Sequence, residues 1–179
     1  MIQKTEISSL EELIDLLDNS TKQEYKALGK RINVPLADFE PFMYYEPDAY
    51  TLNCIKRTED YELLLLCWEE GQATPIHCHN NQECWVHVLK GSLHEIRYQG
   101  DAPKLEVEQE LDLLQEGISY MNDEMGYHSL ANVADGKSIT LHLYMDPIDE
   151  CNIYDEESKE FELKELVYHT YEGEMVEAL

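Results

Sequence analysis

From Tyr50 onward the sequence is divided into short strand-like segments separated by turn residues such as Gly91 and Gly100. Strand-like runs at intervals of roughly 8–12 residues are typical of a β-sandwich or a β-barrel. One or two final strands are expected between residues 149 and 179. The other segments that we expect to form strands are 61–68, 74–79, 85–89, 93–98, 105–107, 117–121 and 139–145.

The N-terminal part has a different pattern. Apolar residues recur at helical spacing from Leu10 to Leu17, which predicts helix within residues 8–31. We therefore predict a mainly β protein in which a short helical N-terminal segment precedes a β-barrel at residues 50–170. At this length, residues 1–179 are expected to form one domain.

The composition is strongly acidic, with 38 Asp and Glu residues against 13 Lys and Arg, a net charge of −25. Nucleic acids and anionic membranes are bound through basic residues, so we expect neither as a partner. No apolar run approaches the roughly 18 residues of a membrane-spanning helix. The N-terminus has no basic region followed by an apolar stretch, and the five cysteines are an odd number. We therefore expect a cytoplasmic monomer with reduced thiols.

His77 and His79 are two residues apart in a strand-like context, which directs both imidazoles to one face. Paired imidazoles suit a divalent metal ion. Gly71 precedes the pair by the same interval as in the first signature of the cupin superfamily, and Gly91 closes the segment. The sequence resembles that signature, except that Cys84 occupies the usual position of a glutamate ligand.

Glu83 offers a competing alignment for that ligand position. It shortens the spacing from His79 by one residue and lengthens the spacing to Gly91. In a strand, Cys84 and Val86 share one face, and Glu83 lies on the other. Either face can line a barrel, so the pattern leaves both alignments open.

A third histidine lies further along the chain. The spacing from Gly117 to Asp123, and from His128 to Asn132, resembles the second cupin signature. The match is partial because Asp123 replaces a proline and Met125 replaces a glycine. His128 would complete a site of three histidines.

Residues 139–145 alternate without a break between apolar and polar side chains. Thr140, His142 and Tyr144 form the polar face of this expected strand. One interpretation is a half-exposed strand whose polar face meets water. The other is a polar barrel interior, in which a chain of hydrogen bonds runs through the three side chains toward a ligand.

Together these motifs resemble the cysteine dioxygenase type I family, with the likeness covering about residues 50–155. The resemblance implies a cupin-type (jelly-roll) β-barrel that holds mononuclear non-haem Fe(II) and uses O2 as co-substrate. It implies oxidation of a small thiol, L-cysteine, to cysteine sulfinate. The iron ligands carried over by motif position are His77, His79 and His128.

The resemblance also implies roles for four further residues. Cys84 and Tyr144 occupy the positions at which the family has a thioether cross-link. His142 matches the histidine that hydrogen-bonds this tyrosine, and Thr140 stands where serine is usual. All four are therefore candidate catalytic residues.

The substrate-binding residues depart from the family pattern. Leu52 stands two residues after Tyr50, where the family has an arginine that pairs with the substrate carboxylate. Arg57 is the nearest arginine in sequence, although alternation directs it away from Leu52 unless a bulge intervenes. Tyr50 and Arg57 are therefore our candidates for binding the substrate. Two alternatives remain open: a dioxygenase for another small thiol, such as a mercaptocarboxylate or an aminothiol, and a metal-binding cupin without catalysis.

Overall fold

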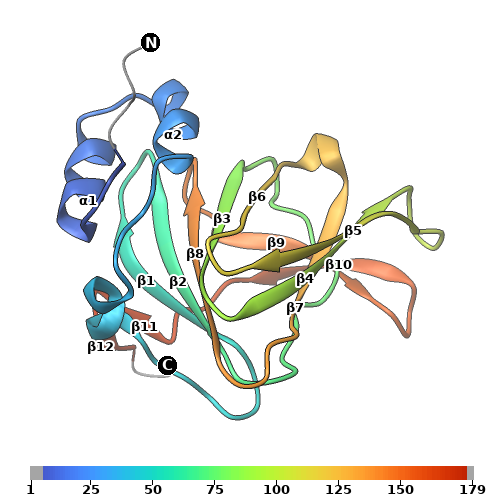
Figure 1. The fold of residues 1–179 in the computed structure, drawn as a ribbon. Helices are drawn as coiled ribbons and strands as arrows, with labels where there is room; N and C mark the ends of the chain where they lie inside the picture. Colours follow the sequence, from blue (N-terminus) through green and yellow to red (C-terminus); the bar gives the residue numbers. More distant parts are fainter. Residues whose placement is uncertain (1–5, 177–179) are drawn as a thin grey trace.

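Three β-sheets build the barrel in the computed structural model, which describes residues 6–176 (Figure 1). Residues 1–5, part of the segment used to judge a signal peptide, lie outside the described residues. The strand orders are β12-β11-β1-β2-β8-β3-β6, β5-β4-β7 and β10-β9. The strands are β1 (Thr51–Arg57), β2 (Glu62–Trp68), β3 (Cys84–Lys90), β4 (Ser92–Gln99), β5 (Glu106–Leu114), β6 (Ile118–Met121), β7 (Tyr127–Asn132), β8 (Ser138–Tyr144), β9 (Glu150–Asp155), β10 (Glu160–Glu165), β11 (Thr170–Tyr171) and β12 (Glu174–Met175).

Two α-helices, α1 (Leu10–Asp18) and α2 (Lys22–Gly29), cover the outer face of the large sheet. Ser9 caps α1 because its side chain accepts a hydrogen bond from the Glu12 amide at 3.1 Å. Short 3-10 turns follow at Leu36–Phe42 (η1) and Asp123–Met125 (η2). Within residues 6–176, no helix is both long and apolar enough to span a bilayer.

The central strands β2, β8 and β3 are buried on both faces, which explains the run of four leucines in β2. Leu63 and Leu65 pack beneath the helices, whereas Leu64 and Leu66 face the barrel interior. Each fully buried leucine stabilises the fold by about 1.5–3 kcal/mol relative to exposure. The sheet therefore forms a rigid wall between the helices and the interior.

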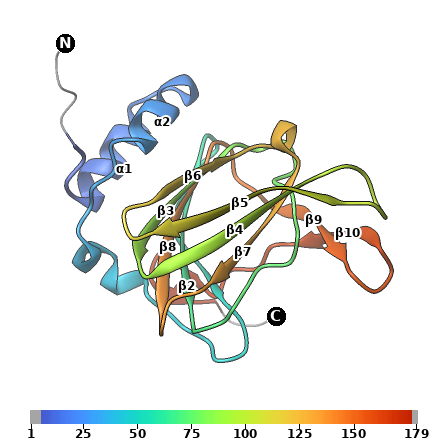
Figure 2. The same ribbon diagram turned by 45° about the vertical axis from the view of Figure 1, so that its right-hand side comes forward.

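The β5-β4-β7 sheet closes the interior from the opposite side (Figure 2). The tight turn between β3 and β4 carries the chain from one sheet to the other. Gly91 in this turn has φ +80°, and a Cβ there would lie 2.0 Å from the Ser138 hydroxyl oxygen. Only glycine fits this position without rearrangement.

The prediction of a mainly β protein with a helical N-terminal segment is confirmed. The prediction of a strand at residues 74–79 is wrong, because His77 forms only isolated bridges, to His128 and to Ile153. Pro75 lacks the amide proton that a continuous strand needs there. The C-terminal part forms four strands, β9 to β12, instead of the expected one or two.

Candidate metal centre

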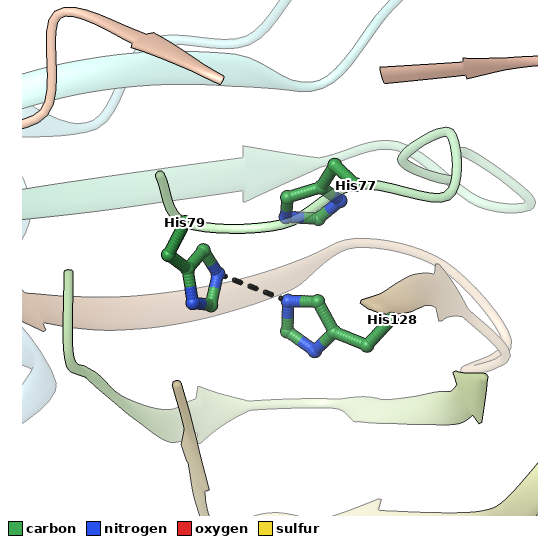
Figure 3. A group of neighbouring side chains, drawn as sticks. All are labelled: His77, His79 and His128. Carbon is green, nitrogen blue, oxygen red and sulfur yellow. Dashed lines mark hydrogen bonds between the residues drawn. The ribbon is translucent and has the colours of Figure 1, made fainter. Parts of the chain in front are cut away.

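His77, His79 and His128 converge inside the barrel (Figure 3). The first two come from the segment between β2 and β3, and His128 comes from β7. The backbones of His77 and His128 exchange two hydrogen bonds of 2.9 Å, which fixes the two segments side by side. The Asp123 carboxylate accepts from the His79 amide at 2.9 Å and fixes the rest of the loop. One ring nitrogen from each histidine lies within 4.8 Å of the others.

Hydrogen bonds at Nδ1 determine which ring nitrogens can bind a metal. The Nδ1 of His77 lies 3.0 Å from the Pro75 carbonyl oxygen, and the Nδ1 of His128 lies 2.8 Å from the Glu95 carboxylate. Both partners are acceptors, so each Nδ1 carries the proton and each Nε2 keeps a free lone pair. Burial lowers the pKa of all three histidines, which keeps them neutral as metal ligation requires.

The spacing of the nitrogens fits a bound ion for one pair and needs a small closure for the widest pair. The Nε2 atoms of His79 and His128 are 3.1 Å apart. Two nitrogens at right angles around one ion, each about 2.1 Å from it, would be about 3.0 Å apart. The widest pair, at 4.8 Å, has to close by about 0.6 Å to reach the limit of about 4.2 Å for one ion. The Nδ1 of His79 is buried without a partner among the described residues.

Glu95 on β4 orients His128 and was missed by sequence analysis. Its carboxylate is fully buried and also accepts from Ser119 at 2.6 Å and from Arg97 at 3.2 Å. A carboxylate bound to the far nitrogen of a histidine fixes its tautomer and raises its basicity toward a metal. The available signal was that two charged residues, Glu95 and Arg97, occupy the inward-facing positions of an alternating strand.

The polar face of β8 is buried inside the barrel, so the half-exposed interpretation of this strand is wrong. The indole of Trp68 donates to the Thr140 hydroxyl at 3.0 Å, and the Thr140 oxygen lies 2.9 Å from the Nε2 of His142. Since an indole can only donate, the threonine proton is left to bond Nε2. The Nδ1 proton of His142 then points toward the Cys84 sulfur, 3.9 Å away.

Cys84 and Tyr144 are direct cross-strand partners on β3 and β8. The Cys84 thiol contacts the Tyr144 hydroxyl, and burial raises the pKa of both groups. The Tyr144 ring also packs edge-on against His79, with 5.6 Å between the ring centroids. Glu83, the competing residue, points to the other face of β3 and accepts a 2.6 Å hydrogen bond from Tyr120. It does not belong to the cluster of ligating side chains among the described residues.

A small cavity of about 40 Å³ adjoins the histidines, and Tyr50 and Leu52 line it. The Tyr50 ring stacks on Trp68 at 4.8 Å. A bulge between Cys54 and Lys56 interrupts β1, which is the condition under which Arg57 could point to the same side as Leu52. Arg57 nevertheless does not line this cavity.

The guanidinium of Arg57 is held at one end of β1. It bonds Asp149 at 2.6 Å, Glu62 at 3.3 Å and the hydroxyl of Tyr168. The structure therefore brings together His77, His79, His128, Cys84, Thr140, His142, Tyr144 and Tyr50, and leaves Arg57 outside the group.

A family model described as cysteine dioxygenase type I matches residues 4–157. The chain belongs to this family. Among its relatives, human cysteine dioxygenase type 1 is 24% identical over 96% of this chain and 93% of its own length. The Danio rerio cysteine dioxygenase type 1 is 26% identical over 97% of this chain and 94% of its own length.

The fold is also similar to that of a solved protein with a double-stranded β-helix domain from Klebsiella pneumoniae. That match has a TM-score of 0.49 and 15% identity, and it covers 59% of this chain and 79% of the other. The cysteine dioxygenase type I family, together with a cluster of three histidines, supports a metal-dependent dioxygenase.

Proposed function

We propose that this protein is an iron(II)-dependent thiol dioxygenase that adds both atoms of O2 to the sulfur of a small thiol. The reaction RSH + O2 → RSO2H balances without a further reductant. L-Cysteine, the substrate named in the family description, is the reference thiol. The observation that carries the proposal is the convergence of three neutral imidazoles, two of them fully buried, beside Tyr144 and a small cavity.

The three histidines would hold the iron. Iron(II) bound there would supply the redox chemistry that allows O2 to react with a thiol. Because all three ligands are neutral, the positive charge of the ion is not cancelled by its ligands, which favours a thiolate over a neutral molecule. Glu95 behind His128 is paired with Arg97, so this buried pair adds no net charge.

Tyr144 is the side chain best placed to donate a hydrogen bond within the cavity. Burial raises the pKa of its hydroxyl, so the phenol keeps its proton at neutral pH. Tyr144 lines the cavity together with His79. We assign to Tyr144 the task of orienting the reacting groups through this proton.

His142 and Thr140 would position the side chains of Cys84 and Tyr144. Burial lowers the pKa of His142 to about 3, so the imidazole stays neutral and its Nδ1 proton remains directed at Cys84. Among the described residues, His142 bonds Thr140 and not Tyr144. We therefore assign His142 to hold the Cys84 sulfur against the Tyr144 ring, where a thioether could form.

We further propose that the protein works as a monomer in the cytoplasm. All five cysteines are buried and free, which suits a reducing compartment.

The test is O2 consumption by iron-loaded protein with a panel of thiols that includes L-cysteine. We expect a sulfinate product, and with ¹⁸O2 we expect both oxygen atoms of the sulfinate to carry the label. His128→Ala should abolish the reaction, whereas His94→Ala, a surface histidine bonded to Asp112, should not. An iron-loaded protein that consumes O2 with none of the thiols would refute the proposal. It would favour a metal-binding cupin without catalysis.

A further inference from the structure

The cavity beside the three histidines is lined only by uncharged side chains. Tyr50, Thr74 and Tyr144 offer hydroxyl groups, and the other lining groups are imidazoles, one thiol, a proline and aliphatic side chains. Six aliphatic residues from different parts of the chain form the apolar part: Leu52, Leu66, Leu130, Ile148, Ile153 and Leu166. With a volume of about 40 Å³, the cavity has room for only a short ligand.

Leu52 is held in its position by the backbone on both sides. Its amide donates to the Nδ1 of His169 at 3.1 Å, and its carbonyl accepts from the His169 amide at 2.8 Å. β1 is also paired with β11 and β2 around this point. The backbone at Leu52 therefore cannot shift away from the cavity without breaking these pairings.

The two arginines on the barrel strands nearest the interior are both engaged elsewhere. Arg57 binds Glu62, Asp149 and Tyr168. Glu62 is fully buried, so a movement of Arg57 toward the cavity would leave a buried carboxylate without its cation. Arg97 is held on β4 by Glu95, Ser119 and the Tyr120 carbonyl.

A carboxylate that entered this cavity would lose its hydration and meet no cationic side chain, since the metal would already bind the sulfur. The hydroxyl groups of Tyr50 and Tyr144 could donate to it, but neither offers the bidentate ion pair that an arginine makes with a carboxylate. The net charge of −25 further disfavours the approach of an anion. An ammonium group would meet no carboxylate in the lining either.

We propose that this site selects a short thiol whose other end carries no charge, such as an alkyl or hydroxyalkyl thiol. The proposal rests on the proposed function, since it assumes that the sulfur reaches a metal held by His77, His79 and His128. The aliphatic side chains would cover the carbon chain. A terminal hydroxyl group would find Tyr50 or Tyr144.

The test compares two thiols that differ only at the far end, 3-mercaptopropanol and 3-mercaptopropionate. Each is titrated without O2 into protein loaded with Co(II), and binding is followed by the absorbance of the cobalt–thiolate bond. We expect 3-mercaptopropanol to bind at least tenfold more tightly. Cysteamine, titrated against 2-mercaptoethanol, tests a cationic end in the same way and should also bind more weakly. Equal or tighter binding of either charged thiol would overturn the proposal.

Two variants identify the residue responsible. Leu52→Arg should reverse the preference toward 3-mercaptopropionate, and Leu52→Met, of similar size and no charge, should preserve it. A preference unchanged in Leu52→Arg would overturn the role of Leu52. If the arginine variant does not fold, the comparison in the unmodified protein still decides the proposal.

This binding test is separate from turnover. Selective binding of the uncharged thiol without O2 consumption would refute the dioxygenase and support the selectivity. Oxidation of a thiol, without tighter binding of the uncharged thiol, would support the dioxygenase and refute the selectivity.

Discussion

Cys84 on β3 and Tyr144 on β8 face each other as direct cross-strand partners on the inner side of the barrel. Side chains in this relationship are about 4.5–5.5 Å apart at Cβ, which places a sulfur against a ring without any movement of the backbone. Cys84 stands at the position where a cupin signature usually holds a ligand, yet its raised pKa keeps it a thiol. The sulfur contacts the Tyr144 hydroxyl and lies outside the cluster of ligating side chains among the described residues.

The first prediction is a thioether bond between Cys84 and a ring carbon of Tyr144. The bond forms with the loss of the thiol hydrogen and one ring hydrogen, and O2 in the presence of iron accepts the two electrons. Peptide mass spectrometry after aerobic incubation with iron and thiol should show one linked peptide, lighter by two hydrogen atoms. Cys84→Ser should give two separate peptides. Unlinked peptides from the unmodified protein after many turnovers would contradict the prediction.

The second prediction concerns iron content. His128→Ala removes one of three ligands and should lose most bound iron. Glu95→Gln keeps an oxygen for His128 but removes the charge behind it, and we expect iron affinity to fall about 10–100-fold. His94→Ala is the matched control, because this histidine binds Asp112 on the surface. Elemental analysis after dialysis measures all three, and unchanged iron in His128→Ala would reject the site.

Alternation along the chain predicted most of the barrel, because a period of two residues is a local property of a strand. It also placed Thr140, His142 and Tyr144 on one face, but burial of that face depends on the opposite sheet, which no local pattern describes. The choice between Glu83 and Cys84 was open for the same reason. Which side of β3 faced the interior was decided by the helices that pack on Trp85.

Partners that are distant in sequence were the hardest to predict. Glu95 reaches His128 only because β4 pairs with β7. The bulge in β1 satisfied the condition set for Arg57, yet Glu62, Asp149 and Tyr168 hold its guanidinium away from the cavity. The strand expected around His77 did not form, although the two histidines still converge.

The third prediction follows from the buried position of Glu62. Arg57→Met would leave this carboxylate with only Tyr168 and the Ile148 amide as partners. We expect a loss of about 3 kcal/mol in the free energy of unfolding, the low end for breaking a buried pair. Denaturant unfolding measures the loss. Asp149→Asn should cost less than about 1 kcal/mol, because Asp149 is 79% exposed. Equal effects of the two variants would show that Glu62 does not need the arginine.

The fourth prediction concerns pH and His87, which lies on the outer face of β3 and is 5% exposed. Burial lowers the pKa of this histidine to about 4, against about 6.5 in the unfolded chain. Its Nε2 has no partner among the described residues, so a proton there would become an unpaired buried donor.

As the pH falls below about 6.5, the unfolded chain takes up this proton first, so the folded state loses stability until about pH 4. The loss amounts to about 3 kcal/mol at 1.36 kcal/mol per pKa unit. His87→Leu should remove this part of the pH dependence, and urea unfolding at several pH values measures the difference from the unmodified protein. His94 supplies a control of opposite sign. Asp112 raises the pKa of His94, so the folded protein takes up this proton first and gains stability as the pH falls. Parallel stability curves for the unmodified protein and His87→Leu between pH 7 and pH 4 would show that His87 does not carry the effect.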